Sequence, residues 1–301
     1  MFDPINSSYS KGYCLSFNDD TKWWITGIGT AISRVNELTY IMNLKECSYN
    51  NTPKLIFIES EDFQTNDNDL ILSNNGWYQY SYWNVNIWYH TSCPNVLCEF
   101  IDQKNKETEN FSPEYMALWF SLQPIYRQNI KNKGLPFHSA LLELDGLGIL
   151  LAGIGNIGKS TCCNRVPKPW KALCDDESLI VLTKDNKYFV HPLPTWSDYI
   201  SNRARNSWDV QYSVPLSAIF FLEQYPEDEV IKIDAVESSM KITQSSAQVW
   251  AKFRQKDKGW KQIDYFRDTF NNAVEIAKQI PAYRLRVSLT GKFWEEIEKV
   301  I

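Results

Sequence analysis

HSALLELDGLGILLAGIGNIGKST, residues 138–161, is the stretch that decides the fold of this chain. Two apolar runs, FHSALLEL and LGILLAG, flank Asp145-Gly146, a dipeptide that favours a two-residue hairpin turn. The segment from Gly153 to Ser160 then matches the G-x-x-x-x-G-K-[ST] pattern of a phosphate-binding loop. A strand, a glycine-rich loop and a helix start, in that order, predict an α/β nucleotide-binding core.

The glycine-rich segment contains the residue types that phosphate binding requires. Glycines allow backbone N–H groups to converge on phosphate oxygens, Lys159 neutralises charge on the outer phosphates, and Ser160 is expected to ligate Mg²⁺. Pro167 and Pro169 limit the following helix to about two turns. A glycine-rich turn without a ligand is the alternative. The expected nucleotide-binding residues are Gly153, Ile154, Gly155, Asn156, Ile157, Gly158, Lys159, Ser160 and Thr161.

The hairpin turn predicts where His138 lies. With Asp145-Gly146 as the turn, Leu144 faces Leu147, and the same register sets His138 opposite Gly153. A lone histidine before an apolar strand is usually structural. This register favours a functional interpretation, because it delivers an imidazole to the first glycine of the loop.

A second cluster is Cys174-Asp175-Asp176-Glu177, followed by the apolar run SLIVL. Acidic runs are usually solvated, but nucleotide chemistry requires one carboxylate for the metal and another to accept a hydroxyl proton. We expect Asp176 to accept the proton and Asp175 to bind or orient the metal, with the two roles open to exchange.

The next turn is expected to bring a further segment to the acidic pair. With Asp185-Asn186 as the turn, Thr195 lies opposite Asp176, which returns HPLPTW, residues 191–196, towards the site. Two prolines in this segment favour a loop instead. If the ladder extends that far, the residues lining the site include His191, Thr195 and Trp196.

Composition and charge narrow the range of partners. The formal net charge of -5 provides no general basic field for nucleic acid. No stretch approaches the roughly 20 apolar residues of a membrane span, and the start, MFDPINSSYSKGY, lacks the pattern of a secretory signal. We therefore expect a cytoplasmic protein without nucleic-acid or membrane partners, with its oligomeric state open.

The cysteines indicate a reducing compartment. Seven cysteines, odd in number and irregularly spaced, are more typical of reduced thiols than of a disulfide framework. His90, Cys93 and Cys98 form the one grouping that hints at a metal. This grouping supplies three ligands where a structural zinc site needs four, which weighs against zinc.

The chain changes character near residue 111. Before it, the strand-like runs YCLSF and KLIFI, the alternating residues 77–90 and a short helix over 31–42 predict an aromatic-rich, β-containing region. Ser112-Pro113-Glu114 predicts a helix start capped by Ser112. We expect an accessory or recognition region over 1–111, a helix and linker over 112–133, and a nucleotide-binding catalytic domain over 134–301.

Two amphipathic helices are expected to cover the catalytic core, one over 234–256 and one over 265–280. Their apolar residues recur at spacings of three to four, which is typical of a buried helix face. The residues expected in the core are Val249, Trp250, Phe253, Phe266, Phe270 and Val274.

The array HSALLELDGLGILLAGIGNIGKST, CDDESLIVL and HPLP resembles the catalytic core of HPr kinase/phosphorylase and its PEP-carboxykinase-like relatives. LPFHSAL, GKSTCCNRVPKPWKALCDDE and HPLPTWS more closely resemble the ScmC family of SynChlorMet cassette proteins, which are associated with cassettes that mature ribosomally made peptides. The resemblance covers residues 134–301 and leaves the first 111 unexplained.

The resemblance implies a mixed-sheet P-loop core that uses ATP and Mg²⁺, with His138, Asp175 and Asp176 at the reaction centre. HPr kinase commonly has an acidic residue after the loop's Lys-Ser, where this chain has Thr161. An arginine that steadies the phosphoryl group is also expected in a later loop. The candidates by position are Arg203 and Arg205.

These features together predict a kinase that transfers a phosphoryl group from Mg-ATP to a Ser or Thr hydroxyl of a ribosomally made peptide or a protein. The expected metal ligands are Ser160 and Asp175. A non-catalytic nucleotide-binding scaffold that recruits other peptide-maturation enzymes, or an ATPase, is the alternative. The short loop helix and the missing acid after Ser160 favour the scaffold, whereas the paired aspartates and His138 favour chemistry.

Overall fold

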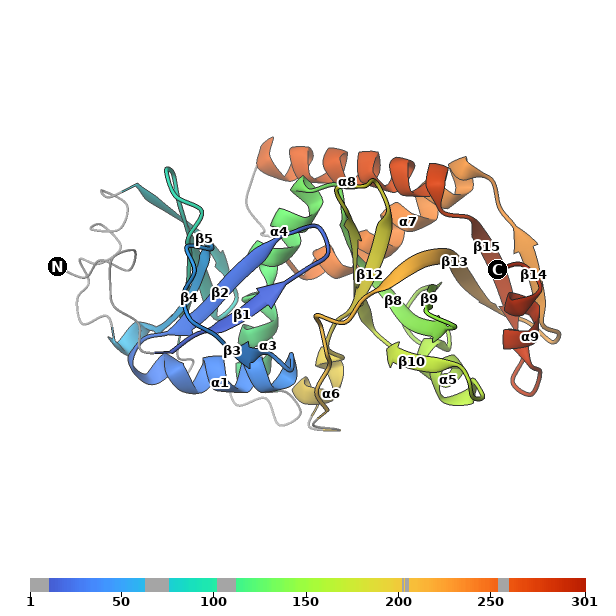
Figure 1. Cartoon of the computed structure of the whole chain (residues 1–301), viewed down its shortest axis with the longest axis horizontal. Coiled ribbons are helices and arrows are strands. Elements are labelled where there is room, and N and C mark those ends of the chain that lie inside the picture. Colours follow the sequence, from blue (N-terminus) through green and yellow to red (C-terminus); the bar gives the residue numbers. More distant parts are fainter. Residues whose placement is uncertain (1–10, 63–75, 102–111, 202, 204–205, 254–259) are drawn as a thin grey trace. The chain divides into compact units, whose positions relative to one another are not determined.

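The computed structural model describes residues 11–62, 76–101, 112–201, 203, 206–253 and 260–301. The chain divides into two compact units, each mixed α/β with a mixed sheet (Figure 1). Unit 1 comprises Met1–Ile125 and Trp196–Gln211, and unit 2 comprises Tyr126–Thr195 and Tyr212–Ile301. The predicted fold class is confirmed at this level.

Unit 1 is built on a seven-stranded sheet of order β3-β1-β2-β4-β7-β6-β5, in which β2, β4 and β7 run parallel. The predicted strands and the 31–42 helix are confirmed, and residues 77–90, expected as a strand or a hairpin, form a hairpin. Ile56, Trp77, Trp88 and Leu97 form part of its core. The strands are β1 (Tyr13–Ser16), β2 (Lys22–Gly27), β3 (Lys45–Glu46), β4 (Lys54–Glu59), β5 (Trp77–Tyr82), β6 (Val85–His90) and β7 (Val96–Phe100), and the helices are α1 (Ile32–Ile41), α3 (Pro113–Phe120) and α6 (Trp196–Ile200).

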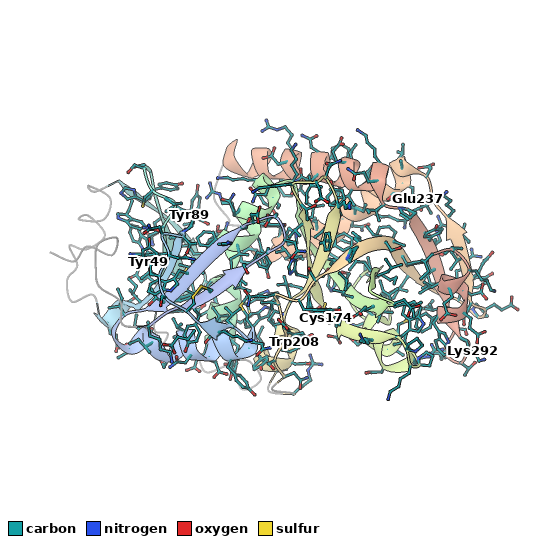
Figure 2. The ribbon with its side chains drawn as sticks, in the orientation of Figure 1. Tyr49, Tyr89, Cys174, Trp208, Glu237 and Lys292 are labelled. Carbon is teal, nitrogen blue, oxygen red and sulfur yellow. A yellow bond between two sulfur atoms is a disulfide. The ribbon has the colours of Figure 1, made fainter. Side chains whose placement is uncertain are left out.

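The expectation that all cysteines are reduced is wrong for one pair, because Cys14 and Cys47 form a disulfide, the yellow bond in Figure 2. Antiparallel pairing of β1 with β3 sets Cys14 opposite Lys45, and the Cys47 N–H donates to the Gly12 carbonyl. The two cysteine Cα atoms therefore lie 5.8 Å apart, within disulfide range. The irregular spacing along the chain conceals this pairing.

Helix α3 starts as predicted at Pro113, with Glu114 in its first turn, but Ser112 makes no side-chain capping hydrogen bond. Its backbone is held instead, since the Ser112 N–H donates to the Ile200 carbonyl. The predicted cap is wrong because this backbone contact fixes the helix start without the hydroxyl.

Unit 2 contains an eight-stranded sheet in which β9, β13 and β15 run parallel and β8 pairs antiparallel with β9, β10 and β11. Helix α4 (Gln123–Lys131) crosses from unit 1 into unit 2. The strands are β8 (Leu135–Leu144), β9 (Leu147–Ala152), β10 (Lys171–Cys174), β11 (Glu177–Leu182), β12 (Tyr188–Pro192), β13 (Val214–Gln224), β14 (Glu229–Lys232) and β15 (Ala282–Val287), and the helices are α5 (Lys159–Arg165), α7 (Ala235–Trp250), α8 (Trp260–Gln279) and α9 (Phe293–Glu298).

The second hairpin is one residue out of its predicted register. Leu182 pairs with Tyr188, and the Thr183 N–H donates to the Lys187 carbonyl. Asn186 has a φ of 61°, which closes a three-residue loop with a left-handed residue rather than a two-residue turn. The predicted alignment of Thr195 with Asp176 is therefore wrong.

Helices α7 and α8 lie side by side (Figure 1), and α7 packs on β8. Val249, Trp250 and Phe253 are buried as predicted, but Phe266 is 39 % and Phe270 47 % exposed. The core prediction fails for these two because the buried face of α8 passes through other positions. That face consists of Thr269, Asn272, Ala273 and Ile276, at spacings of three to four. Among the described helices, none combines the length and apolarity needed to cross a bilayer.

Candidate functional site

Strand β8 lies between the two segments that the sequence marks for chemistry. Leu141 pairs with Leu150 of β9 on one edge of β8 and with Cys174 of β10 on the other. Strand β10 ends at Cys174, labelled in Figure 2, and β11 begins after Asp176, also paired with β8. Asp175 and Asp176 therefore connect two strands on one edge of β8, while the other edge pairs with the strand that enters the glycine-rich loop.

The hairpin of β8 and β9 has the predicted register. The Asp145-Gly146 turn has positive φ at both residues, 50° and 80°, as a type I′ turn requires. Leu144 pairs with Leu147, and the ladder stops one pair short of His138 and Gly153. The hairpin thus brings the backbone of His138 to the start of the loop.

The loop between β9 and α5 depends on glycine at particular positions. Gly158 has a φ of 116° and Asn156 a φ of 64°, so the chain turns through left-handed conformations before the helix. A Cβ added to Gly153 would lie 2.8 Å from Ile157 Cγ2, whereas one added to Gly155 would meet open space. Conformation therefore requires glycine at 158, whereas a side chain at 153 would displace that of Ile157.

Lys159 is buried, with 6 % of its surface exposed. Its Nζ donates to the Gly153 carbonyl over 3.2 Å and to the Ile154 carbonyl over 3.3 Å. Burial lowers the pKa of Lys159, and the nearby negative charges of Asp176 and Asp175 act in the opposite direction. The ammonium group is therefore enclosed by the loop within the field of the acidic pair.

His138 and Asp176 form a side-chain pair. The Nε2 atom of His138 lies 3.2 Å from Asp176 Oδ1, with the two side chains 15 % and 24 % exposed. The other ring nitrogen, Nδ1, lies 2.8 Å from Oε1 of Gln248 on α7. The structure thus brings His138 and Asp176 together and adds a third group from a distant helix.

Asp175 is held by a different partner. Thr195 Oγ1 donates to Asp175 Oδ1 over 2.5 Å. Thr195 was expected beside Asp176, so the structure brings the predicted threonine to the acidic pair but places it on the neighbouring carboxylate. The two aspartates therefore have distinct surroundings, with a hydroxyl on Asp175 and an imidazole on Asp176.

The hydroxyl residues after Lys159 are exposed. Ser160 and Thr161 lie at the start of α5, a helix of seven residues that confirms the predicted limit of about two turns. Neither hydroxyl has a hydrogen-bond partner within the described parts of the chain. Both are accessible to a ligand in the loop.

Sequence reasoning missed Gln248 and Gln224. The Nε2 atom of Gln224, the last residue of β13, lies 3.4 Å from the Asn156 carbonyl and 3.3 Å from the Ile157 carbonyl, to which it donates. A glutamine at the end of a strand or on an amphipathic helix has no distinguishing local pattern. Only the packing of β13 and α7 around the loop and β8 identifies these two residues.

His191, Arg203 and Trp196 are each held by contacts of their own. His191 is fully buried in β12 within the ladder with β11. Arg203 of unit 1 forms an ion pair with Asp198, and Trp196 is fully buried in unit 1. Arg205 lies outside the described residues.

The described residues contain no group of three or more His, Cys, Asp or Glu arranged to hold a metal ion. Cys98 is fully buried in β7, and burial raises the pKa of its thiol. His90 Nδ1 contacts the Ser92 backbone N–H at 3.2 Å. Cys98 is thus enclosed in the core of unit 1, and His90 contacts the segment that follows β6.

A cleft of about 470 Å³ lies between the β11–β12 hairpin and α8, lined among others by Tyr188, Phe270 and Glu275. Burial raises the pKa of Tyr188 to about 12. None of the candidate residues lines this cleft. The candidate site is therefore defined by its polar contacts rather than by this cavity.

The comparisons with known proteins point to one family. A family model described as SynChlorMet cassette protein ScmC matches residues 96–301. No curated protein matches the chain. The matched range includes the hairpin, the glycine-rich loop, the acidic pair and both long helices.

Proposed function

We propose that the chain, which belongs to the SynChlorMet cassette protein ScmC family, is an ATP-dependent phosphotransferase of a peptide-maturation cassette. The acceptor in this proposal is a Ser or Thr hydroxyl of a ribosomally made peptide or of a protein. The nucleotide-binding core is proposed to be of the HPr-kinase and PEP-carboxykinase type. The parallel strands β9, β13 and β15, with the glycine-rich loop after β9, support this type of core.

One observation carries the proposal. The ammonium group of Lys159, enclosed by the loop, lies within the field of Asp175 and Asp176, and Asp176 is in contact with His138. A lysine with a purely structural role requires only one hydrogen-bonding or charged partner. An acidic run exposed to solvent requires no such partner. A buried cation beside two carboxylates at a glycine-rich loop is the arrangement that phosphoryl transfer requires.

Phosphate binding in this proposal uses the loop and Lys159. The ammonium group now donates to the carbonyls of Gly153 and Ile154, which are weak partners for a buried charge. Phosphate oxygens would replace these carbonyls and form charge-assisted hydrogen bonds with Nζ, which are stronger. The backbone N–H groups of the loop would bind the remaining oxygens.

Asp175 and Ser160 fit Mg²⁺, which nucleotide sites hold through one or two protein oxygens together with the phosphates. Asp175 Oδ1 accepts from Thr195, and Oδ2 has no hydrogen-bond partner among the described residues. The Ser160 hydroxyl is exposed. When bound, Mg²⁺ supplies positive charge that stabilises the phosphates as negative charge develops on them.

Asp176 is the proposed general base. It accepts the proton of the acceptor hydroxyl while the hydroxyl oxygen forms a bond to the γ-phosphorus and the bond to the β-phosphate oxygen breaks. His138 contacts the same carboxylate and holds it in place. Lys159 stabilises the charge that accumulates on the transferred group.

Two observations favour the alternatives of a nucleotide-binding scaffold or an ATPase. Helix α5 is short, and Thr161 stands where an acidic residue commonly follows the Lys-Ser pair. A scaffold would bind nucleotide and recruit other peptide-maturation enzymes without transfer, and an ATPase would release free phosphate without a peptide acceptor.

Titration calorimetry with ATP and ADP, with and without Mg²⁺, tests the site. We expect Mg²⁺-dependent binding that Lys159→Ala loses and Lys187→Ala retains, because Lys187 lies exposed on the β11–β12 turn. Absence of binding to the folded wild-type protein would contradict the site. Transfer from radiolabelled ATP to co-incubated cassette peptides then separates the functions.

In the transfer assay, labelled peptide supports the phosphotransferase, free phosphate without peptide identifies an ATPase, and binding without either product identifies a scaffold. Lys159→Ala should lower the transfer rate by a factor on the order of 10² to 10³, which is typical for the loss of one preorganised charge contact. Transfer at the wild-type rate in this variant would exclude Lys159 from the reaction.

A further inference from the structure

Both ring nitrogens of His138 contact side chains, and the two partners come from different parts of unit 2. Nε2 lies 3.2 Å from Oδ1 of Asp176, between β10 and β11, and Nδ1 lies 2.8 Å from Oε1 of Gln248, on α7. Strand β8 fixes the backbone of His138 by pairing with Glu177. The two side-chain contacts fix the orientation of the ring.

The chemistry of Gln248 Oε1 determines which ring nitrogen carries hydrogen. An amide oxygen accepts hydrogen bonds and cannot donate them, so its contact at 2.8 Å requires a hydrogen on Nδ1 of His138. Nε2 is therefore the nitrogen that faces Asp176, and its 3.2 Å approach to Oδ1 requires one hydrogen between the two atoms.

The position of Gln248 is set by the packing of α7. Asp234 caps the helix by accepting from the Glu237 N–H over 2.8 Å. Ser246 and Val249, on either side of Gln248, are buried, and the helix packs on β8. The amide is therefore delivered to His138 by a helix that is anchored on both sides of it.

We propose that Gln248 is a positioning residue that keeps a hydrogen on Nδ1 of His138 and so presents Nε2 to Asp176. Its catalytic consequence rests on the proposed function: the oriented ring holds Oδ1 of Asp176 in place while this carboxylate accepts the hydroxyl proton.

Nitrogen NMR of the ring tests the assignment without nucleotide. The chain contains three histidines, so ¹⁵N-histidine labelling gives few signals, and His138→Gln identifies the one of interest. We expect Nδ1 of His138 to carry hydrogen in the wild type and in Gln248→Glu, which keeps an acceptor oxygen. Gln248→Met should lose this preference. Gln244→Met, at an exposed position on the same helix, should keep it.

A wild-type His138 with no hydrogen on Nδ1, or a Gln248→Met ring that is unchanged, would overturn the assignment. If Gln248→Met does not fold, the ring spectra of the wild type and of Gln248→Glu still decide whether Nδ1 of His138 carries hydrogen. In the transfer assay, Gln248→Met should lower kcat about 10- to 100-fold with the KM for ATP unchanged. An unchanged kcat would overturn the positioning role, whereas absence of transfer by the wild type would reject the proposed function and leave the NMR result standing.

Discussion

Thr195 Oγ1 donates to Asp175 Oδ1 over 2.5 Å, and this contact joins two distant chain segments at the candidate site. Thr183 donates to Asp185 over the same distance, but within the exposed β11–β12 turn. The two contacts share their chemistry and differ in location. They provide a matched pair for testing whether the threonine orients a functional carboxylate.

Thr195→Val removes the hydroxyl and keeps the shape, so Asp175 loses the group that orients it. Groups that orient metal-binding carboxylates typically contribute 10- to 100-fold in affinity, and we expect Mg²⁺-dependent ATP binding to weaken by about tenfold. Titration calorimetry measures the change. Thr183→Val should bind as the wild type does, and equal affinity in the two variants would contradict a role for Thr195.

Lys159 predicts a pH-dependent stability. Burial lowers its pKa in the folded state, so the unfolded chain holds this proton to higher pH and stability rises with pH up to the ordinary value of 10.5. Lys159→Met removes the buried charge. We expect the variant to be more stable near neutral pH by about 0.5–2 kcal/mol, and the difference to shrink as pH approaches 10.5. Urea denaturation across this range measures it, and a difference that grows with pH would contradict the sign.

The disulfide of unit 1 predicts a redox-dependent stability. Cys14 and Cys47 enclose a loop with a sequence separation of 33, and closing a loop of this size constrains the unfolded chain. Cys14→Ser with Cys47→Ser should lower the free energy of unfolding by about 3–4 kcal/mol. Denaturation with and without reductant measures this, with Cys93→Ser as the control. If reductant still lowers the stability of the double variant, the redox dependence would come from other cysteines.

The glycine-rich loop offers a matched pair of glycines. Gly158 has a φ of 116°, so Gly158→Ala forces a side chain into a strained conformation, at about 1–2 kcal/mol. Gly155 has open space at its Cβ, and Gly155→Ala should change stability by no more than about 0.5 kcal/mol. Thermal and urea unfolding compare the two. Equal destabilisation would contradict the described loop conformation.

The orientation of α8 predicts that replacing its apolar residues by alanine lowers the stability by unequal amounts. Ile276 is fully buried, and Ile276→Ala should cost about 2–4 kcal/mol of stability. Phe270 is 47 % exposed, and Phe270→Ala should cost less than about 1 kcal/mol. Urea denaturation of both variants checks the helix orientation. A larger cost at Phe270 would mean that the other face is buried.

Local turn chemistry explains which hairpin was predictable. Asp145-Gly146 closes a two-residue type I′ turn, and this leaves one register for the strands, so the approach of His138 to Gly153 follows from the sequence. Asp185-Asn186 is compatible with two loop lengths. Asn186 adopts the left-handed conformation of the longer one, and this single backbone choice shifts the following strand by one residue.

The sequence also carries the amphipathic pattern of α8 but leaves its orientation ambiguous. Apolar residues occur on two neighbouring faces, and the pattern of Phe266 and Phe270 is as regular as that of Ala273 and Ile276. Burial of one face depends on which surface α7 and β8 offer. Periodicity therefore predicts the helix, and packing selects its buried side.

By itself the sequence determined the mixed α/β class and the strand, loop and helix order around Lys159, because short-range backbone preferences govern these features. The tertiary structure alone decided which side chains pair. Gln248 pairs with His138 and Thr195 with Asp175 through hydrogen bonds, and Cys47 pairs with Cys14 through a disulfide. Each of these contacts joins segments that are far apart along the chain. Only the packing of whole strands and helices brings such groups within hydrogen-bonding or bonding distance.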